Sequence, residues 1–160
     1  MAPLSKSTPS MAPDTYQLVV FGCQRIANFP RYSHTWAVFL KSQEAKHTPP
    51  LREGEQVVIS WLPVSLDIDL TGPPEAGKNF SLSETRDIVH TMRSELKSWG
   101  PLQIRKKLYD LAAQRVEELE SGTVQYVVGD DDYRPDQATN CIHALSDLGL
   151  TKRPLVRPQE

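Results

Sequence analysis

The sequence predicts an α+β domain in which helices pack on one face of an antiparallel sheet. Strand-like runs rich in β-branched and aromatic residues come first in the chain, at residues 16–21, 34–41 and 56–62. Apolar residues at helical spacing follow from residue 82 onward. A short helix with a cysteine at its start comes last. Strands followed by helices, rather than a strict alternation of the two, are typical of the α+β class.

The second of these runs places a histidine on an apolar strand face. Successive side chains of a strand point to opposite faces, so residues two apart share a face. His34 therefore lies on the same face as Trp36, Val38 and Leu40. A long polar connection leads to the third run, which Pro63 ends. That run places Ser60 on the same face as Val58 and Leu62.

Two longer helices are predicted between residues 82 and 122. Ser81 and Glu84 have the spacing of a capping box, so the first helix begins near residue 82 and runs through Leu96. The segment 99–101 breaks this helix, and its proline suits the first turn of a second helix, which ends at Gly122. The apolar stripe of the second helix consists of Ile104, Leu108, Leu111, Ala112, Val116 and Leu119.

The last helix carries the cysteine. A further strand is predicted at 123–128, and after an acidic loop either Thr139 or Asn140 can cap the helix that begins at Cys141. If this helix covers the strand face that carries His34, the imidazole and the Cys141 thiol meet at the edge of that face. The order of elements thus permits a contact between two residues far apart in the sequence.

The composition limits the size and class of the protein. A chain of 160 residues with 39% hydrophobic residues supports one domain, expected at residues 16–150 between a disordered leader (1–15) and a tail (151–160). The net charge of −2, with both signs mixed along the chain, predicts no nucleic-acid partner. The longest apolar run is far too short to cross a bilayer, and the leader is not an intact secretory signal. We therefore expect a soluble, cytoplasmic protein without stable membrane insertion.

Cys141 is the candidate nucleophile. At a helix start, unpaired backbone N–H groups and the positive end of the helix dipole favour the thiolate and lower the thiol pKa. The thiol also needs a proton acceptor within hydrogen-bond reach, and His34 on a strand is the candidate base. His143 is nearer in the sequence, but two helical residues turn the side chain by roughly 200°. His143 is therefore expected to point away from Cys141 and to cap or pack its helix.

Other interpretations of these residues stay open. Free cysteine usually behaves as a small buried hydrophobe, so Cys141 and especially Cys23 can be structural. Two cysteines do not make a disulfide scaffold, and the reduced state is expected, although one bridge between them remains an alternative. Cysteine and histidine are also zinc ligands, but the spacing of Cys141 and His143 lacks a second ligand pair, so no metal is predicted. The acidic residues 130–132 predict a solvated loop.

Two short motifs resemble those of a known superfamily. The segment 34–39 (His-Thr-Trp-Ala-Val-Phe) on a strand, followed far downstream by 140–144 (Asn-Cys-Ile-His-Ala) on a helix, resembles the circularly permuted NlpC-type branch of the papain-like fold. This branch includes the lecithin retinol acyltransferase-like enzymes, whose cysteine motif also reads Asn-Cys-x-His. In that branch the histidine strand precedes the cysteine helix, as it does here. The resemblance covers two stretches, 34–40 and 133–149.

The resemblance implies a permuted papain-like fold and a thiol hydrolase or acyltransferase that works through an acyl-enzyme. It implies that Cys141 is the nucleophile and that His34 is the general base and later the acid. A third polar group orients the imidazole in such enzymes. Relatives carry a second histidine on the next strand, where this chain has Ser60, and a tyrosine upstream of the cysteine, here Tyr133, that can bind the oxyanion. The substrate class is a peptide-like amide, slightly favoured, or an acyl lipid, and no cofactor is implied.

The absence of a histidine at position 60 leaves two functions open. Asp67 and Asp69 follow the Ser60 strand and can replace it as the orienting group only if the chain folds back. A serine stabilises an imidazolium less than a charged group does. The alternative function is therefore a catalytically inactive domain of the same fold that binds a peptide or protein partner. Alkylation of Cys141 well below pH 8, slowed by His34→Ala, is the behaviour expected of the enzyme.

Overall fold

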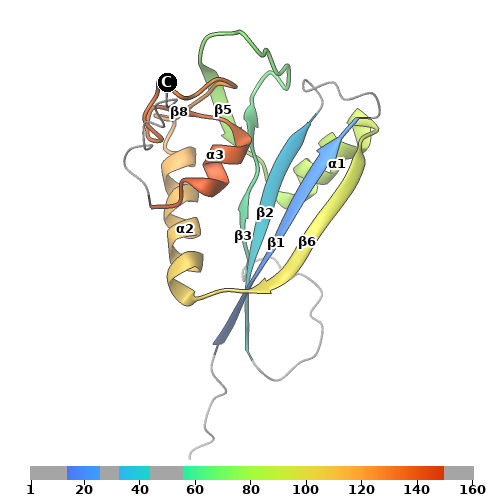
Figure 1. Ribbon diagram of the computed structural model, residues 1–160, viewed down its shortest axis with the longest axis vertical. Helices are drawn as coiled ribbons and strands as arrows, with labels where there is room; N and C mark the ends of the chain where they lie inside the picture. The colour runs from blue at the N-terminus through green and yellow to red at the C-terminus, as the bar shows by residue number, and fades with distance from the viewer. Residues whose placement is uncertain (1–13, 26–32, 44–55, 150–160) are drawn as a thin grey trace, which may run out of the picture.

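The computed structural model describes residues 14–25, 33–43 and 56–149, which form an α+β fold (Figure 1). The first sheet is antiparallel with strand order β3-β2-β1-β6: β1 (Asp14–Gln24), β2 (His34–Gln43), β3 (Gln56–Ile59) and β6 (Glu95–Gln103). The second sheet has the order β4-β5-β7-β8 and is antiparallel except for the β7–β8 pair: β4 (Trp61–Pro63), β5 (Glu75–Asn79), β7 (Gln125–Tyr126) and β8 (Ala138–Thr139). The helices of the described residues are α1 (Leu82–Met92), α2 (Lys106–Glu120) and α3 (Cys141–Ser146).

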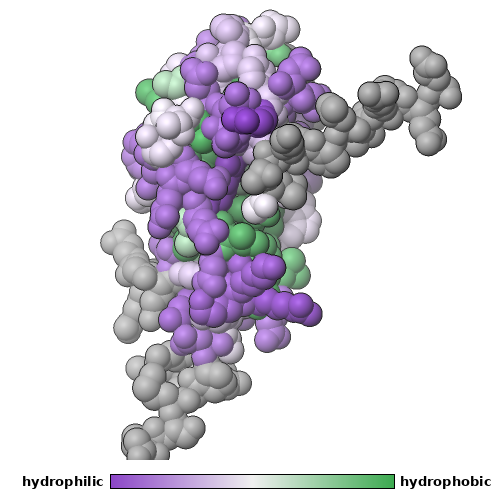
Figure 2. All heavy atoms as spheres, turned by 90° about the vertical axis from the view of Figure 1, so that its left-hand side faces the viewer, coloured by the Kyte–Doolittle hydropathy of each residue, from purple (hydrophilic) through white to green (hydrophobic). Residues whose placement is uncertain are grey.

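The surface over α2 and α3 is largely hydrophilic, with a hydrophobic patch near its centre (Figure 2). Charged and polar residues account for the outward face of α2, among them Lys106, Lys107, Gln114, Glu117 and Glu120. Within residues 14–25, 33–43 and 56–149, no helix has both the length and the apolar composition needed to cross a membrane. The predicted tail and most of the predicted leader lie outside the described residues, but β1 begins at Asp14, inside the predicted leader.

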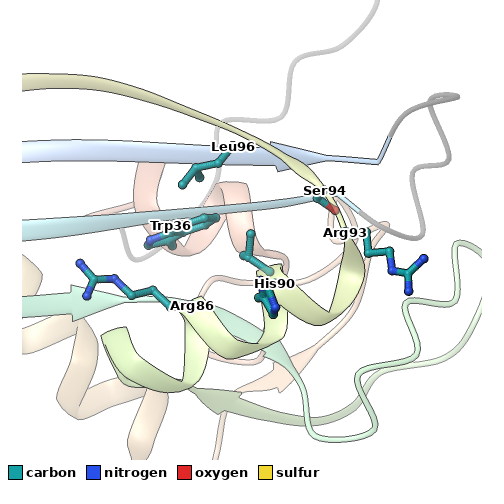
Figure 3. A pocket seen from close by; sticks show the side chains of 7 residues that line it. Trp36, Arg86, His90, Arg93, Ser94 and Leu96 are labelled. Carbon is teal, nitrogen blue, oxygen red and sulfur yellow. The ribbon is translucent and has the colours of Figure 1, made fainter.

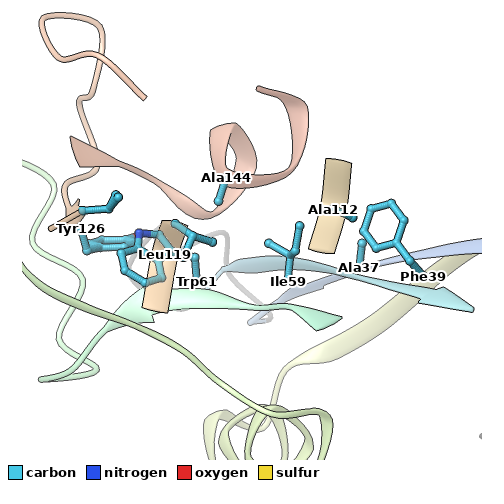
Figure 4. Packing of buried hydrophobic residues seen from close by; sticks show 9 residues of the cluster. Ala37, Phe39, Ile59, Trp61, Ala112, Leu119, Tyr126 and Ala144 are labelled. Carbon is cyan, nitrogen blue, oxygen red and sulfur yellow. The ribbon is translucent and has the colours of Figure 1, made fainter. Parts of the chain in front are cut away.

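Helices cover both faces of the first sheet. On one face, Trp36 of β2 points toward α1 (Figure 3) and packs with Val89 of that helix. On the other face, Ala144 of α3 packs with Ala37 and Phe39 of β2, together with residues of α2 (Figure 4). The prediction that helices lie on one face is therefore wrong. Helix α1 has an apolar stripe of its own, and burial of that stripe requires the second face of the sheet.

The helix ends follow local sequence signals. Ser81 and Glu84 form the predicted capping box at the start of α1. Gly122, with a φ of 80°, directly follows the last turn of α2, as predicted. The side chain of Asn140, one of the two predicted caps, accepts hydrogen bonds from the backbone N–H groups of Ile142 and His143. Each cap depends on residues within four positions, which is why the sequence alone reveals it.

Strand β6 lies where the sequence predicted the end of one helix and the start of the next. Helix α1 does not reach Leu96, because Arg93 adopts the left-handed conformation with a φ of 50° and ends it. The chain then pairs antiparallel with β1, and α2 starts only after this strand rather than at Pro101. Backbone pairing with β1 outweighs the local helix signals. Gly100 lies where this pairing shifts register, and a Cβ there would be 2.6 Å from the Leu18 carbonyl oxygen.

The predicted third strand divides at Ser60. Residues before it pair with β2, whereas residues after it pair with β5 of the second sheet. The strand predicted at 123–128 is shorter than expected, since only Gln125 and Tyr126 form β7. Helix α3 is also shorter, ending at Ser146 rather than at Gly149. The division at Ser60 affects the candidate site most, because the chain leaves the first sheet there, close to the first residues of β2.

Gly77→Ala is expected to lower the free energy of unfolding by about 1–3 kcal/mol. A Cβ at position 77 would overlap the Trp61 ring, which is fully buried and donates a hydrogen bond from Nε1 to the Thr139 carbonyl at 3.1 Å. Urea unfolding measures the change. Gly129→Ala is the matched control, because a Cβ there meets no atom within 4 Å. Equal stability of the two variants would contradict this packing.

Candidate active site

Cys141 is the first residue of α3, and its thiol is surrounded by backbone N–H groups. Burial raises the pKa of the thiol, whose residue is 9% exposed, while hydrogen bonds from the backbone N–H groups of Thr35, Cys141 and Ile142 act in the opposite direction. Desolvation is the larger influence, so the pKa lies above its ordinary value. The helix start therefore supplies anion-stabilising groups, as predicted, but burial keeps the resting thiol neutral.

A buried carboxylate holds the start of α3 in place. Asp130 Oδ2 accepts a hydrogen bond from the Asn140 backbone N–H at 2.9 Å, and Asp130 Oδ1 lies 2.7 Å from His143 Nδ1. Asp130 is 2% exposed, so the prediction of a solvated acidic loop is wrong for this residue, although Asp131 and Asp132 are exposed. A carboxylate can be buried here because backbone and side-chain donors satisfy it. His143 thus anchors its own helix, in keeping with the packing role predicted for it.

His34 is the first residue of β2 and is almost completely buried, at 1% exposure. Its Nε2 lies 2.9 Å from Ser60 Oγ, and its ring stacks on Trp36 with a centroid distance of 5.3 Å. Within the described residues, Nδ1 has no hydrogen-bond partner. Burial lowers the pKa of His34 to about 3, so the imidazole is neutral at pH 7.

The structure brings His34 together with Ser60, the residue predicted to orient it. Ser60 lies at the break between β3 and β4 and is fully buried. Its hydroxyl also lies 2.7 Å from Thr85 Oγ1 of α1. Thr85 was missed by the sequence analysis. A weak signal was present, because Thr85 lies four residues before Val89 on the buried stripe of α1, a position that usually carries an apolar residue.

The thiol and the imidazole approach β2 from different sides. Since His34 stacks on Trp36, its ring lies on the face that α1 covers, whereas α3 packs on the opposite face. The expectation that the cysteine helix covers the His34 face is therefore wrong. Helix α3 instead packs on the other face through Ala144, which belongs to the core cluster that contains Ala37 and Phe39 of β2. Cys141 instead reaches β2 through the backbone N–H of Thr35, the residue next to His34.

The described part of the chain leaves the start of β2 unpaired on the side of β3. Strand β3 pairs with β2 only from Ala37 to Leu40, so among the described strands none pairs with His34 and Thr35 on that side. The division of the chain at Ser60 creates this opening. Cys141 contacts Thr35 there, and the side chain of His34 reaches Ser60 across the same gap. Cys141 and His34 therefore lie at neighbouring positions of β2 but on opposite faces, and among the described residues the hydrogen bond of the imidazole goes to Ser60 rather than to the thiol.

Two tyrosines lie in the chain segments that precede Cys141. Tyr133, the predicted oxyanion donor, belongs to the connection between β7 and β8, where its N–H closes a turn onto the Asp130 carbonyl at 3.1 Å. Its role at the oxyanion stays a prediction. Tyr126 is buried in the main core, and burial followed by the charge of Cys141 raises its pKa. Tyr126 is thus a neighbour of Cys141 that the sequence analysis did not single out.

A cavity of about 300 Å³ lies on the α1 side of the sheet, not beside the thiol (Figure 3). Its lining consists of Trp36, Arg86, Val89, His90, Arg93, Ser94 and Leu96. Through Trp36 this cavity adjoins His34, which stacks on the same ring. In the part of the chain that the structure describes, no three His, Cys, Asp or Glu side chains converge as metal ligands do.

Comparisons of the chain with family models, with curated proteins and with solved structures find no match.

At pH 7, iodoacetamide is expected to modify Cys141 in the folded chain at least about tenfold more slowly than in the urea-unfolded chain. Burial both shields the thiol and raises its pKa, so the rate should increase with pH to above 9. Peptide mass spectrometry after timed labelling separates Cys141 from Cys23. The sequence predicts rapid alkylation well below pH 8 for an enzyme, and the burial of Cys141 reverses that expectation for the resting chain. Rapid labelling below pH 8 that His34→Gln slows would contradict a neutral resting thiol.

Proposed function

We propose that the chain is a thiol hydrolase or acyltransferase of the circularly permuted papain-like fold, with Cys141 as nucleophile and His34 as general base. The observation that carries the proposal is that Cys141 lies against the backbone of Thr35, the residue next to His34 at the start of β2. Cys141 accepts a hydrogen bond from the Thr35 N–H there, and His34 is held by Ser60. The order of a histidine strand before a cysteine helix supports the permuted form of the fold.

In the proposed reaction, the resting pair is a neutral thiol and a neutral imidazole. As the Cys141 sulfur attacks the acyl carbon, the thiol proton passes to His34, and the new oxyanion accepts hydrogen bonds from the Cys141 backbone N–H and from one further donor, for which Tyr133 is the candidate. The imidazolium then gives its proton to the leaving amine or alcohol, which departs with the electrons of the broken bond. Water, deprotonated by His34, then attacks the acyl carbon, the C–S bond breaks to release the acid, and His34 returns the proton to the Cys141 sulfur. A second acceptor in place of water gives acyl transfer.

A peptide-like amide is the favoured substrate class, and an acyl lipid is the alternative. The experiment exposes the full chain to mixed peptides and acyl lipids, quenches it with acid and searches for an acyl adduct by mass spectrometry. An adduct on Cys141 that is lost in Cys141→Ala supports the proposal, and the mass of the adduct identifies the substrate class. Adducts confined to other residues would refute it.

A second candidate is an inactive domain of this fold that binds a peptide or protein partner. The burial of both groups favours it, because the pKa of Cys141 is raised while that of His34 is about 3. Proton transfer from thiol to imidazole is then strongly unfavourable in the resting state. In an enzyme, substrate binding must bring the pKa values of Cys141 and His34 closer together. A binding domain has no such requirement. Absence of any acyl adduct on Cys141, with a peptide retained by the folded chain, would support the second candidate.

A further inference from the structure

The cavity between α1 and the first sheet has apolar walls. Trp36 of β2, Val89 of α1 and Leu96 of β6 contribute these walls, and the cavity measures about 300 Å³ (Figure 3). Sites for small molecules are usually concave and mostly apolar, with a few polar groups that fix the orientation of the ligand. The apolar walls therefore suit the hydrocarbon or aromatic part of a small molecule.

The ionisable side chains of this cavity are all basic. Arg86, His90 and Arg93 are four and three residues apart, so they lie on one face of α1. All of them are exposed at the rim of the cavity. Among the described residues that line the cavity, none is acidic. The rim therefore favours an anion.

The carboxylates near these cations in the sequence are directed elsewhere. Glu84 is paired with a lysine of β5 at 2.8 Å, and Glu95 points to the face of β6 opposite to the lining residue that follows it. Asp87 directly follows Arg86 and so projects about 100° around the helix from it. Among the described residues, Arg86 and Arg93 form neither an ion pair nor a side-chain hydrogen bond. The positive charge of the cavity thus has no counter-ion in the described part of the chain.

One end of the cavity carries two hydrogen-bond donors that lack an acceptor among the described residues. Figure 3 shows Arg86 and Arg93 extending to opposite ends, with the indole nitrogen of Trp36 at the end toward Arg86. Trp36 is 2% exposed, and its Nε1–H group is buried without a partner in the described structure. A buried N–H group without an acceptor is costly. An anionic oxygen between the indole and the guanidinium gives both groups an acceptor.

We propose that this cavity binds a small organic carboxylate. Its carboxylate group lies between the Arg86 guanidinium and the Trp36 Nε1–H group, since a guanidinium binds a carboxylate through two parallel hydrogen bonds. Its apolar body lies against Val89 and Leu96. The indole N–H is covered in the described structure, so binding includes a shift of the exposed side chains at the rim. The site is independent of the proposed reaction, because the helix that carries Cys141 packs on the other face of the sheet.

The experiment titrates the ¹⁵N-labelled full chain with 4-phenylbutyrate at pH 7 and follows the three indole N–H resonances, those of Trp36, Trp61 and Trp99. We expect a saturable shift of the Trp36 resonance with a Kd of about 1 mM or lower, the affinity within reach of a ligand of this size. Arg86→Gln should raise the Kd at least about fivefold, because a charge-assisted hydrogen bond is lost. Since 4-phenylbutanol keeps the apolar body but has no charge, it should bind at least about fivefold more weakly.

Arg105→Gln is the matched control, because Arg105 is an exposed arginine at the start of α2, outside the cavity, and its side chain makes no cap hydrogen bond. Its Kd should stay within about twofold of the unmodified chain. Arg93→Gln, at the opposite end of the cavity, should raise the Kd less than Arg86→Gln does.

Two results would overturn the position of the carboxylate: an unchanged Kd in Arg86→Gln, or a larger increase in Arg93→Gln than in Arg86→Gln. Equal affinities for the acid and the alcohol would show that the cavity does not select an anion. Absence of a saturable Trp36 shift up to about 10 mM ligand, or a shift confined to Trp61 or Trp99, would overturn the site itself. None of these results depends on an acyl adduct at Cys141, so the site and the proposed function fail separately.

Discussion

Cys141→Ala is expected to lower the turnover of an activated ester such as p-nitrophenyl acetate by about a thousandfold or more. The sulfur is the atom that forms the acyl bond in the proposed reaction, and alanine offers no nucleophile in its place. Release of nitrophenolate, followed by its absorbance, measures the rate. His34→Gln in the same assay is expected to lower the rate by about 10²- to 10⁴-fold, the usual contribution of a general base.

Cys23→Ala is the matched control for this experiment. Cys23 is also a free, buried cysteine, and it pairs with His34 across β1 and β2. Its thiol lies on the α1 side of the sheet, in the cluster with Trp36 and Val89, and has no part in the proposed reaction. Turnover should therefore stay within about threefold of the unmodified chain. If Cys141→Ala keeps the full rate, another residue or the solvent performs the reaction, and the proposed nucleophile is wrong.

The parts of the site that could be predicted from the sequence depend on neighbours in the chain. The cap at Asn140, which fixes the start of α3 at Cys141, involves residues two and three positions away. The alternation along β2 correctly puts His34 and Trp36 on one face. In these two cases a local rule limits the backbone to one arrangement. Ser60 is identified as a partner of His34 only through the resemblance, because relatives carry a histidine at the equivalent position of the next strand.

The parts that could not be predicted depend on packing between distant segments. Periodicity shows that α3 has an apolar stripe, but it does not show which face of the sheet that stripe covers. Ala144 belongs to the core cluster that contains Ala37 and Phe39, and this packing places α3 on the face opposite to His34. The burial of Asp130 is equally non-local, because its partners belong to α3. Only the fold reveals that Cys141 lies against the backbone of Thr35, next to His34, while the two side chains lie on opposite faces of β2.

The stability of the folded chain is expected to fall as the pH is lowered from about 6.5 toward 3, with His34 as a principal cause. The ordinary pKa of histidine is 6.5, and burial lowers that of His34 to about 3 in the folded chain. Between these values the unfolded chain binds a proton at this position, whereas the folded chain does not. The contribution of the neutral, buried His34 to the free energy of unfolding is therefore at its full value above pH 6.5. It decreases by about 1.4 kcal/mol for each pH unit below, to a total of about 5 kcal/mol near pH 3.

Urea unfolding at a series of pH values between 4 and 7 measures this slope. Carboxylates that titrate in the same range affect the unmodified chain and His34→Gln alike. The pH dependence of the free energy of unfolding is therefore compared between these two proteins. Glutamine stays neutral and can still donate to Ser60, so the variant should fold and show the shallower slope. His90→Gln removes an exposed histidine of α1 and controls for the substitution itself. Equal slopes for the unmodified chain and His34→Gln would mean that the imidazole can take up a proton in the folded chain, because Nδ1 then has access to water or to an acceptor. An imidazole that takes up a proton in the folded chain could deprotonate Cys141 in the resting state. The proposed resting state of a neutral thiol and a neutral imidazole would then be wrong.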